Sequence, residues 1–160
     1  MTILSNNMLS LRASFLIYTA LSVVLICVSS QSLYKIFNHQ YRDQALDYTT
    51  GNRIVGCHIN YDSNNQNWRI VHLGDSFVAF QNAATGLFIG VNGQEIVAGA
   101  NPYKWQYSVV SSGWYQILTE DGSKVLFLTG QEDYDPVILK EIEYKGPDAQ
   151  WGYTPAPSTP

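Results

Sequence analysis

Short apolar segments follow one another in the same order three times along the chain, and each copy of the pattern closes on a tryptophan. In the segments that open each copy, apolar and polar residues alternate, which is typical of a strand with one buried face. A repeat of about forty residues with one apolar face per copy indicates three units around a shared core, because no copy buries that face alone. Three copies of four segments predict twelve strands: openers at 34–38, 78–82 and 115–119, second strands at 45–49, 87–91 and 125–129, third strands at 53–55, 95–97 and 136–138, and closers that begin at Trp68, Trp105 and Trp151.

Turn pairs that contain glycine punctuate these segments, at Thr85-Gly86, Asn92-Gly93 and Asp121-Gly122. Such pairs join neighbouring strands as short hairpins. The chain has 160 residues, of which 46% are hydrophobic and 14% charged, and this composition fits one domain of ordinary size. We therefore predict an all-β domain of three four-stranded repeats.

The charge balance excludes one class of partner. Nine Lys and Arg residues stand against thirteen Asp and Glu residues, which gives a formal net charge of -4 at pH 7. Binding to a phosphate backbone needs clustered Lys and Arg, and the chain has no such cluster. We expect no nucleic-acid partner.

Residues 1–30 differ in character from the rest of the chain. Residues 13–28 are apolar apart from Ser and Thr, follow Arg12 and lead into Ser29-Ser30, a pattern typical of a secretory signal. This apolar stretch is shorter than the roughly 20 residues that a membrane-spanning helix needs. We predict a signal-like leader over 1–30, a secreted product and no stable membrane insertion of the mature domain. A membrane anchor, or a leader without signal function that leaves the protein cytoplasmic, is the alternative.

The folded domain should cover residues 31–153. Residues 154–160 are rich in proline, which cannot donate to a sheet ladder, so we predict an extended tail there. Without the leader one thiol remains, that of Cys57, and a single cysteine cannot form an internal disulfide.

The closing motifs carry a resemblance to a known family. Gln66-Asn67-Trp68 is an intact Gln-x-Trp closer, and Lys104-Trp105 and Gln150-Trp151 are degenerate ones. With the three-repeat layout, the chain resembles the ricin-B-type β-trefoil, and more narrowly the small single-domain ricin-B-like lectins of mushrooms. The resemblance implies a six-stranded barrel capped by three hairpins with pseudo-threefold symmetry. It also implies glycans or glycoproteins as partners, a role in defence, no cofactor and no catalytic machinery.

The closing tryptophans are first interpreted as residues of the hydrophobic core. Large aromatics at one register of a repeat are most often core residues, and we expect this of Trp68 and Trp151. For Trp105 two interpretations stay open, because a short, proline-containing loop precedes it and leaves nearby aromatics less covered.

Repeat one is the first candidate site. A pyranose needs a flat aromatic wall and a few carboxylate or amide groups. Ricin-type repeats supply an Asp in the second strand, an aromatic near the third, and Asn-Gln before the closer. Asp47, Asn65 and Gln66 match this pattern, whereas His58 or nearby Tyr61 stands where the aromatic is expected. The alternative is a solvated strand residue beside a polar loop.

Repeat two is the second candidate, on a different set of residues. It lacks the second-strand Asp, but the resemblance to mushroom lectins assigns Asn101, Tyr103 and Trp105 to a site for fucosylated N-glycan cores. A further aromatic of that site is missing from the turn after the second strand. Repeat three has Leu128-Thr129 at the Asp position and an acidic loop at 132–135, so we expect no sugar there.

The sequence shows no motif that supports an enzymatic activity. His39, His58 and His72 are scattered, no metal-ligand spacing occurs, and Cys57 and His58 are strand neighbours that point to opposite faces. We expect no catalysis. The alternative function is a β-trefoil protease inhibitor that acts through an exposed loop, such as 60–67 or 145–147, and a non-binding structural trefoil is the third interpretation.

Overall fold

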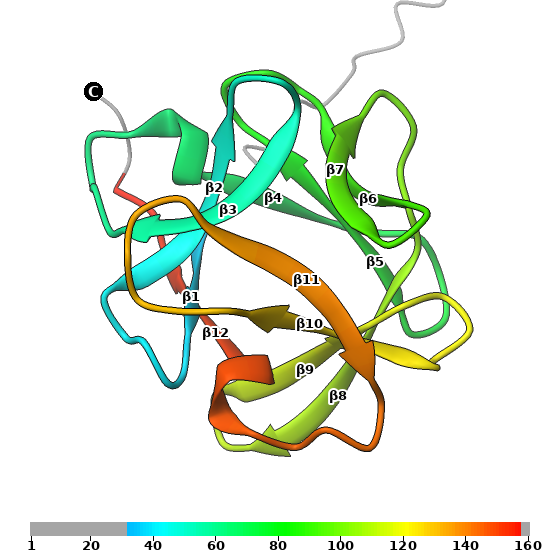
Figure 1. Cartoon of the computed structure of the whole chain (residues 1–160). Helices are drawn as coiled ribbons and strands as arrows, with labels where there is room; N and C mark the ends of the chain where they lie inside the picture. The colour runs from blue at the N-terminus through cyan, green and yellow to red at the C-terminus, as the bar shows by residue number, and fades with distance from the viewer. Residues whose placement is uncertain (1–31, 158–160) are drawn as a thin grey trace, which may run out of the picture.

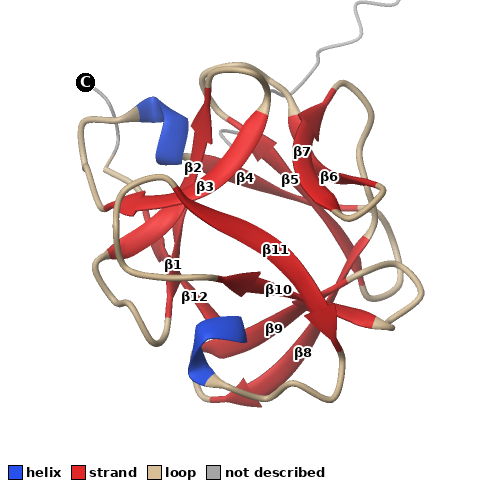
Figure 2. Cartoon of the chain, viewed as in Figure 1, coloured by secondary structure: helices blue, strands red, loops and turns tan. Residues whose placement is uncertain are grey.

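The computed structural model describes residues 32–157, which form twelve strands and two short 3₁₀ helices (Figure 2). Each of the twelve predicted strands is confirmed to within a few residues. The leader predicted over residues 1–30 lies outside the described residues. The elements are β1 (Leu33–Asn38), β2 (Gln44–Thr49), β3 (Arg53–His58), η1 (Asn64–Gln66), β4 (Trp68–His72), β5 (Phe77–Asn82), β6 (Phe88–Asn92), β7 (Glu95–Gly99), β8 (Trp105–Ser111), β9 (Trp114–Leu118), β10 (Lys124–Leu128), β11 (Asp135–Glu141), η2 (Pro147–Ala149) and β12 (Trp151–Pro155).

Six of the strands close into a barrel. The antiparallel pairs β1–β12, β12–β9, β9–β8, β8–β5, β5–β4 and β4–β1 form a complete ring. The other six strands are three hairpins, β2–β3, β6–β7 and β10–β11, which pair with one another through β3, β7 and β11. Figure 1 shows these hairpins around the centre of the molecule. The arrangement is the all-β β-trefoil that the resemblance implies, with repeat one as β1–β4, repeat two as β5–β8 and repeat three as β9–β12.

The closing tryptophans repeat one contact three times. Trp68, Trp105 and Trp151 are buried, and each indole Nε1 donates to a carbonyl oxygen of its own repeat's second strand. The acceptors are Leu46 at 3.0 Å, Ile89 at 2.9 Å and Leu126 at 3.0 Å. A buried indole N–H needs such a partner, which explains why this position holds Trp. The core prediction is confirmed for Trp68 and Trp151 and extends to Trp105.

A buried asparagine at the end of the opening strand shapes the turn that follows in two repeats. The Oδ1 atom of Asn38 accepts from the backbone N–H of Gln40 and Tyr41, and that of Asn82 accepts from Ala84 and Thr85. The Nδ2 atom of Asn82 also donates to the carbonyl of Asn65 at 2.8 Å. Repeat two therefore anchors the loop of repeat one that precedes Trp68.

The end of the domain differs from the prediction. Strand β12 continues to Pro155, which lies opposite Tyr34, and the N–H of Ala156 donates to the carbonyl of Leu33 at 2.7 Å. The expectation that proline keeps residues 154 and 155 out of the sheet is wrong, because a proline at a strand end removes a single donor and its fixed φ suits extended backbone.

Within residues 32–157 no helix is long and apolar enough to cross a membrane.

Candidate functional site

A hollow of about 330 Å³ opens on the surface of repeat one, between the β2–β3 hairpin, the β3–β4 loop and the β10–β11 loop. The four residues predicted for a site in repeat one, namely Asp47, His58, Asn65 and Gln66, all line it. They come from β2, β3 and η1, so the fold brings together positions up to nineteen residues apart in the chain.

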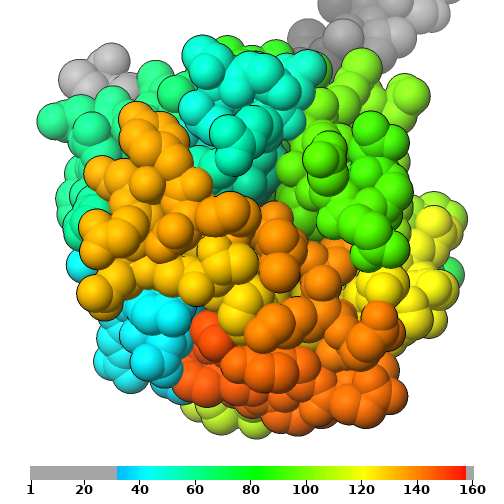
Figure 3. Space-filling model, in the orientation of Figure 1, coloured from blue at the N-terminus to red at the C-terminus, as the bar shows by residue number. Residues whose placement is uncertain are grey.

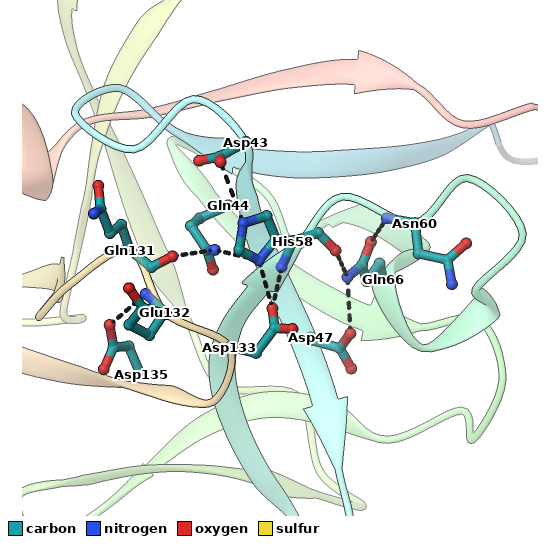
Figure 4. A network of polar contacts seen from close by, with 10 residues as sticks. All are labelled: Asp43, Gln44, Asp47, His58, Asn60, Gln66, Gln131, Glu132, Asp133 and Asp135. Carbon is teal, nitrogen blue, oxygen red and sulfur yellow. Dashed lines mark hydrogen bonds and ion pairs between the residues drawn. The ribbon is translucent and has the colours of Figure 1, made fainter.

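Gln66 holds this site together from inside. The side chain is 1% exposed, and its Nε2 donates to Asp47 Oδ2 and to the carbonyl of His58, both at 2.9 Å. Its Oε1 accepts from the backbone N–H of Asn60 at 2.8 Å. Figure 4 shows these bonds converging on the Gln66 amide. Gln66 therefore fixes the Asp47 carboxylate and closes the β3–β4 loop, and both atoms of its amide are already bonded to protein groups.

Asp47 is a partly desolvated carboxylate on the wall of the hollow. Burial raises its pKa, the bond from Gln66 and the charge of Lys35 oppose that shift, and the charge of Asp133 adds to it. Oδ2 is bonded to Gln66, whereas Oδ1 has no hydrogen-bond partner among the described residues. A carboxylate oxygen of this kind is a strong acceptor for ligand hydroxyls.

A buried lysine fastens the same loop. Lys35 of β1 is fully buried, and its Nζ donates to the carbonyls of Asn60 at 2.8 Å and Ser63 at 3.4 Å and to Asn67 Oδ1 at 3.0 Å. Burial lowers the pKa of this amine, against the opposing charges of Asp47 and Asp62. Sequence reasoning missed Lys35, although a lysine next to the buried Ile36 in an opening strand is a signal that could have identified it.

The aromatic wall that repeat one lacks comes from repeat three. Tyr134, in the β10–β11 loop, lines the hollow and is 64% exposed. Its N–H donates to the carbonyl of Gly56 at 2.8 Å, with a positive φ of 70°. In Figure 3 the orange surface of this loop lies against the surface of repeat one. Tyr61, the alternative considered from sequence, does not line the hollow.

His58 joins three segments through its imidazole ring. Nδ1 lies 2.8 Å from Asp133 Oδ1 in the β10–β11 loop, and Nε2 lies 3.3 Å from Asp43 Oδ2, which precedes β2. Asp133 Oδ1 also accepts from the backbone N–H of His58 at 2.7 Å. The bond to Asp133 raises the pKa of His58, and the charges of Asp133, Asp43 and Glu132 add to the shift. His58 thus positions the loop that carries Tyr134.

The residues predicted in repeat two do not form one site. Trp105 is fully buried, so its ring offers no face to a ligand, and its assignment to a binding surface is wrong: the short loop leaves the indole in the core, with Tyr103 against it at a ring distance of 4.8 Å. Tyr103 lines a second hollow of about 440 Å³ with Asp121 and Lys124 of repeat three. Asn101 is exposed and does not line that hollow.

The part of the chain that the structure describes contains no candidate metal site. Across residues 32–157 no group of three or more His, Cys, Asp or Glu side chains is placed to hold a metal ion. The His58 cluster does not qualify, since its two carboxylates contact different ring nitrogens.

Comparisons with known proteins agree with this fold. Residues 64–140 match the model of a family described as ricin-type beta-trefoil lectin domain-like. No curated protein matches the chain. The ricin B-like lectin of Macrolepiota procera, solved with lactose, is 22% identical with a TM-score of 0.69, and 79% of this chain and 96% of that chain are covered.

Two other solved structures share the fold. The Rhizoctonia solani agglutinin is 19% identical with a TM-score of 0.68, and 78% of this chain and 95% of that chain are covered. An exo-beta-1,3-galactanase from Clostridium thermocellum is also 19% identical, with a TM-score of 0.65, but this fold spans only 30% of that chain against 78% of the present one. The same fold thus occurs as a stand-alone lectin and as part of an enzyme.

Proposed function

We propose that this chain, which resembles the ricin-type β-trefoil lectins in sequence pattern and in fold, binds carbohydrate through the hollow of repeat one. One observation carries the proposal: the carboxylate of Asp47, the loop amide of Asn65 and the ring of Tyr134 line one hollow although they come from different segments. The lactose bound to the Macrolepiota lectin fits the same class of ligand.

Each of these groups suits one part of a pyranose. The ring of Tyr134 offers a face for the C–H groups of the sugar, as aromatic rings do in sites for amphipathic ligands. Asp47 Oδ1 accepts sugar hydroxyls in charge-assisted bonds, and the exposed amide of Asn65 both donates and accepts. Gln66, Lys35 and His58 already fix the walls of the hollow. Binding therefore needs little further ordering of the loops, and the entropic cost of that ordering is small.

The test is a broad glycan array, run beside a panel of serine and cysteine proteases. We expect glycan binding that falls about tenfold in Tyr134→Ala, the equivalent of roughly 1.4 kcal/mol. Tyr61→Ala is the matched control, since Tyr61 is a loop tyrosine of similar exposure, 59%, that does not line the hollow. A flat array together with inhibition of a protease would replace this proposal with the β-trefoil inhibitor.

The hollow beside Tyr103 supports a second carbohydrate site. Its lining includes an aromatic ring, the Asp121 carboxylate and the hydroxyls of Thr119 and Ser123. We propose that this second hollow recognises fucosylated N-glycan cores. We expect Tyr103→Ala to reduce binding of such cores by the equivalent of about 1–2 kcal/mol while the fold is retained. Unchanged binding of core-fucosylated glycans in this variant would remove the assignment.

Secretion and a role in defence belong to the same proposal. They rest on the signal-like pattern of residues 1–30 and on the resemblance to mushroom lectins. The mature N-terminus of the native protein tests the secreted location.

A further inference from the structure

Acidic side chains surround the hollow of repeat one. Asp47 and Asp133 line it, and Asp43 contacts the ring of His58. Asp62 and Glu132 lie close enough to act electrostatically on Lys35 and His58. We call these five residues the acidic rim. They come from four segments: β2 and the turn before it, the β3–β4 loop, and the β10–β11 loop.

Lys35 and His58 offset only part of the negative charge of the acidic rim. Among residues 32–157, no Lys or Arg lines the hollow. Lys35 lies beneath the loop, is fully buried, and directs its Nζ to three oxygen atoms of that loop. His58 lies between two carboxylates, so even its protonated ring carries less charge than its two partners together. The surface that a ligand meets is therefore negative.

A negative hollow treats ligands differently according to their charge. Charges a few ångströms apart at a protein surface interact appreciably even after solvent screening, and low-dielectric walls concentrate the field. A sugar carboxylate or sulfate meets like charge and also loses hydration. A protonated amine meets opposite charge, and Asp47 Oδ1 is placed to accept from it.

We propose that the repeat-one hollow selects its saccharide by charge: it favours sugars that carry a free amine, accepts neutral sugars, and rejects sugars that carry a carboxylate or sulfate. This inference rests on the proposed function of the same hollow, because it names the class of saccharide that the hollow takes.

Matched ligands test the selection directly. A broad array is printed with neutral glycans, their sialylated or sulfated derivatives and their N-deacetylated derivatives, and it is read at about 20 mM salt and at about 500 mM salt. We expect anionic derivatives to bind at least about tenfold more weakly than their neutral parents at low salt, with a smaller ratio at high salt. Anionic derivatives that bind as well as their parents would overturn the charge selection and leave carbohydrate binding in place. No binding by any member would remove the proposed function itself.

A pair of charge variants assigns the effect to the rim. Asp62→Asn/Glu132→Gln removes two rim charges whose carboxylate groups make no hydrogen bond among the described residues and do not line the hollow. Asp75→Asn/Glu143→Gln changes the net charge equally through two exposed residues outside the hollow and its loops. We expect the rim variant to bind anionic derivatives several-fold better and the control to behave as wild type. Equal effects in both variants would show that overall charge, and not the rim, is responsible.

Discussion

At the scale of single residues, each closing tryptophan combines a large buried surface with one buried hydrogen bond. Trp68→Ala removes the ring from the core and leaves the carbonyl of Leu46 without its donor. We expect it to lower the free energy of unfolding by about 3–5 kcal/mol, the range for large-to-small changes in a packed core. Denaturant titration measures this loss. Trp114, which is only half-buried, is the control, and an equal loss in Trp114→Ala would contradict the special role of the closers.

The charge of His58 makes the contact between β3 and the β10–β11 loop depend on pH. Its pKa is raised by the bond to Asp133, so the folded state favours the protonated ring. The stabilisation that the charged ring contributes is therefore fully present below the ordinary histidine pKa and is lost as pH rises through the raised value. The pKa of Asp133 is lowered by the same contacts, which keeps its carboxylate charged throughout this window.

The variant His58→Gln isolates this effect. We expect wild type to be more stable than the variant at about pH 5.5, and the difference to shrink as pH rises toward about 8.5 because the ring loses its proton. The midpoint of thermal unfolding of both proteins across this range measures it. A difference that grows with pH would have the wrong sign for a histidine held by carboxylates.

At the scale of elements, the sequence predicted all twelve strands because the same order of short apolar segments recurs three times between turn residues, with an alternation of apolar and polar residues in the openers. It also predicted Asp47, Asn65 and Gln66 at one site, because they belong to a single repeat and lie near one another in its hairpin and loop. Contacts between repeats leave no such local signal. Tyr134 reaches repeat one from repeat three, and Lys35 reaches a loop that follows it by 25 residues.

The close approach of β3 and the β10–β11 hairpin depends on a glycine. A Cβ atom at Gly56 would lie 2.5 Å from Leu128 Cδ1 and 3.3 Å from Gln44 Oε1. We expect Gly56→Ala to force the hairpin outward, to cost about 1–3 kcal/mol of stability as overpacking does, and to weaken glycan binding because Tyr134 moves with the hairpin. Gly99→Ala is the matched control, since a Cβ there meets nothing within 4 Å. Denaturation and glycan binding of both variants measure the effect, and equal stability would contradict the packing argument.

At the scale of the whole molecule, the core keeps the threefold symmetry and the surface does not. The three indole contacts are equivalent, whereas the residue that follows the indole's acceptor is Asp47 in repeat one but Gly90 and Phe127 in the other repeats. The site of repeat one also includes a loop of repeat three, which contributes Asp133 and Tyr134. A symmetric barrel with unequal surfaces explains why repeats of similar pattern do not predict three equal sites.

The leader is tested by the mature N-terminus of the native protein. Because its apolar stretch is short for a membrane crossing, we expect a secreted product that begins near Gln31 and lacks residues 1–30. Mass spectrometry of protein purified from its natural source measures this end. Recovery of Met1 or Thr2 in soluble native protein would contradict secretion and favour a cytoplasmic lectin.

The central claim is that carbohydrate binds in the hollow of repeat one. The most direct measurement is a titration of isotope-labelled protein with the strongest ligand of the glycan array, followed through the backbone amide signals by NMR. The account predicts that the amide signals that shift until the ligand saturates the protein concentrate at the residues that line this hollow, namely 47–50, 57–58, 60, 63, 65–66 and 133–134. The central claim would be contradicted if the ligand saturated the protein while only signals from other surfaces shifted, such as those of the hollow beside Tyr103, and the repeat-one signals stayed in place.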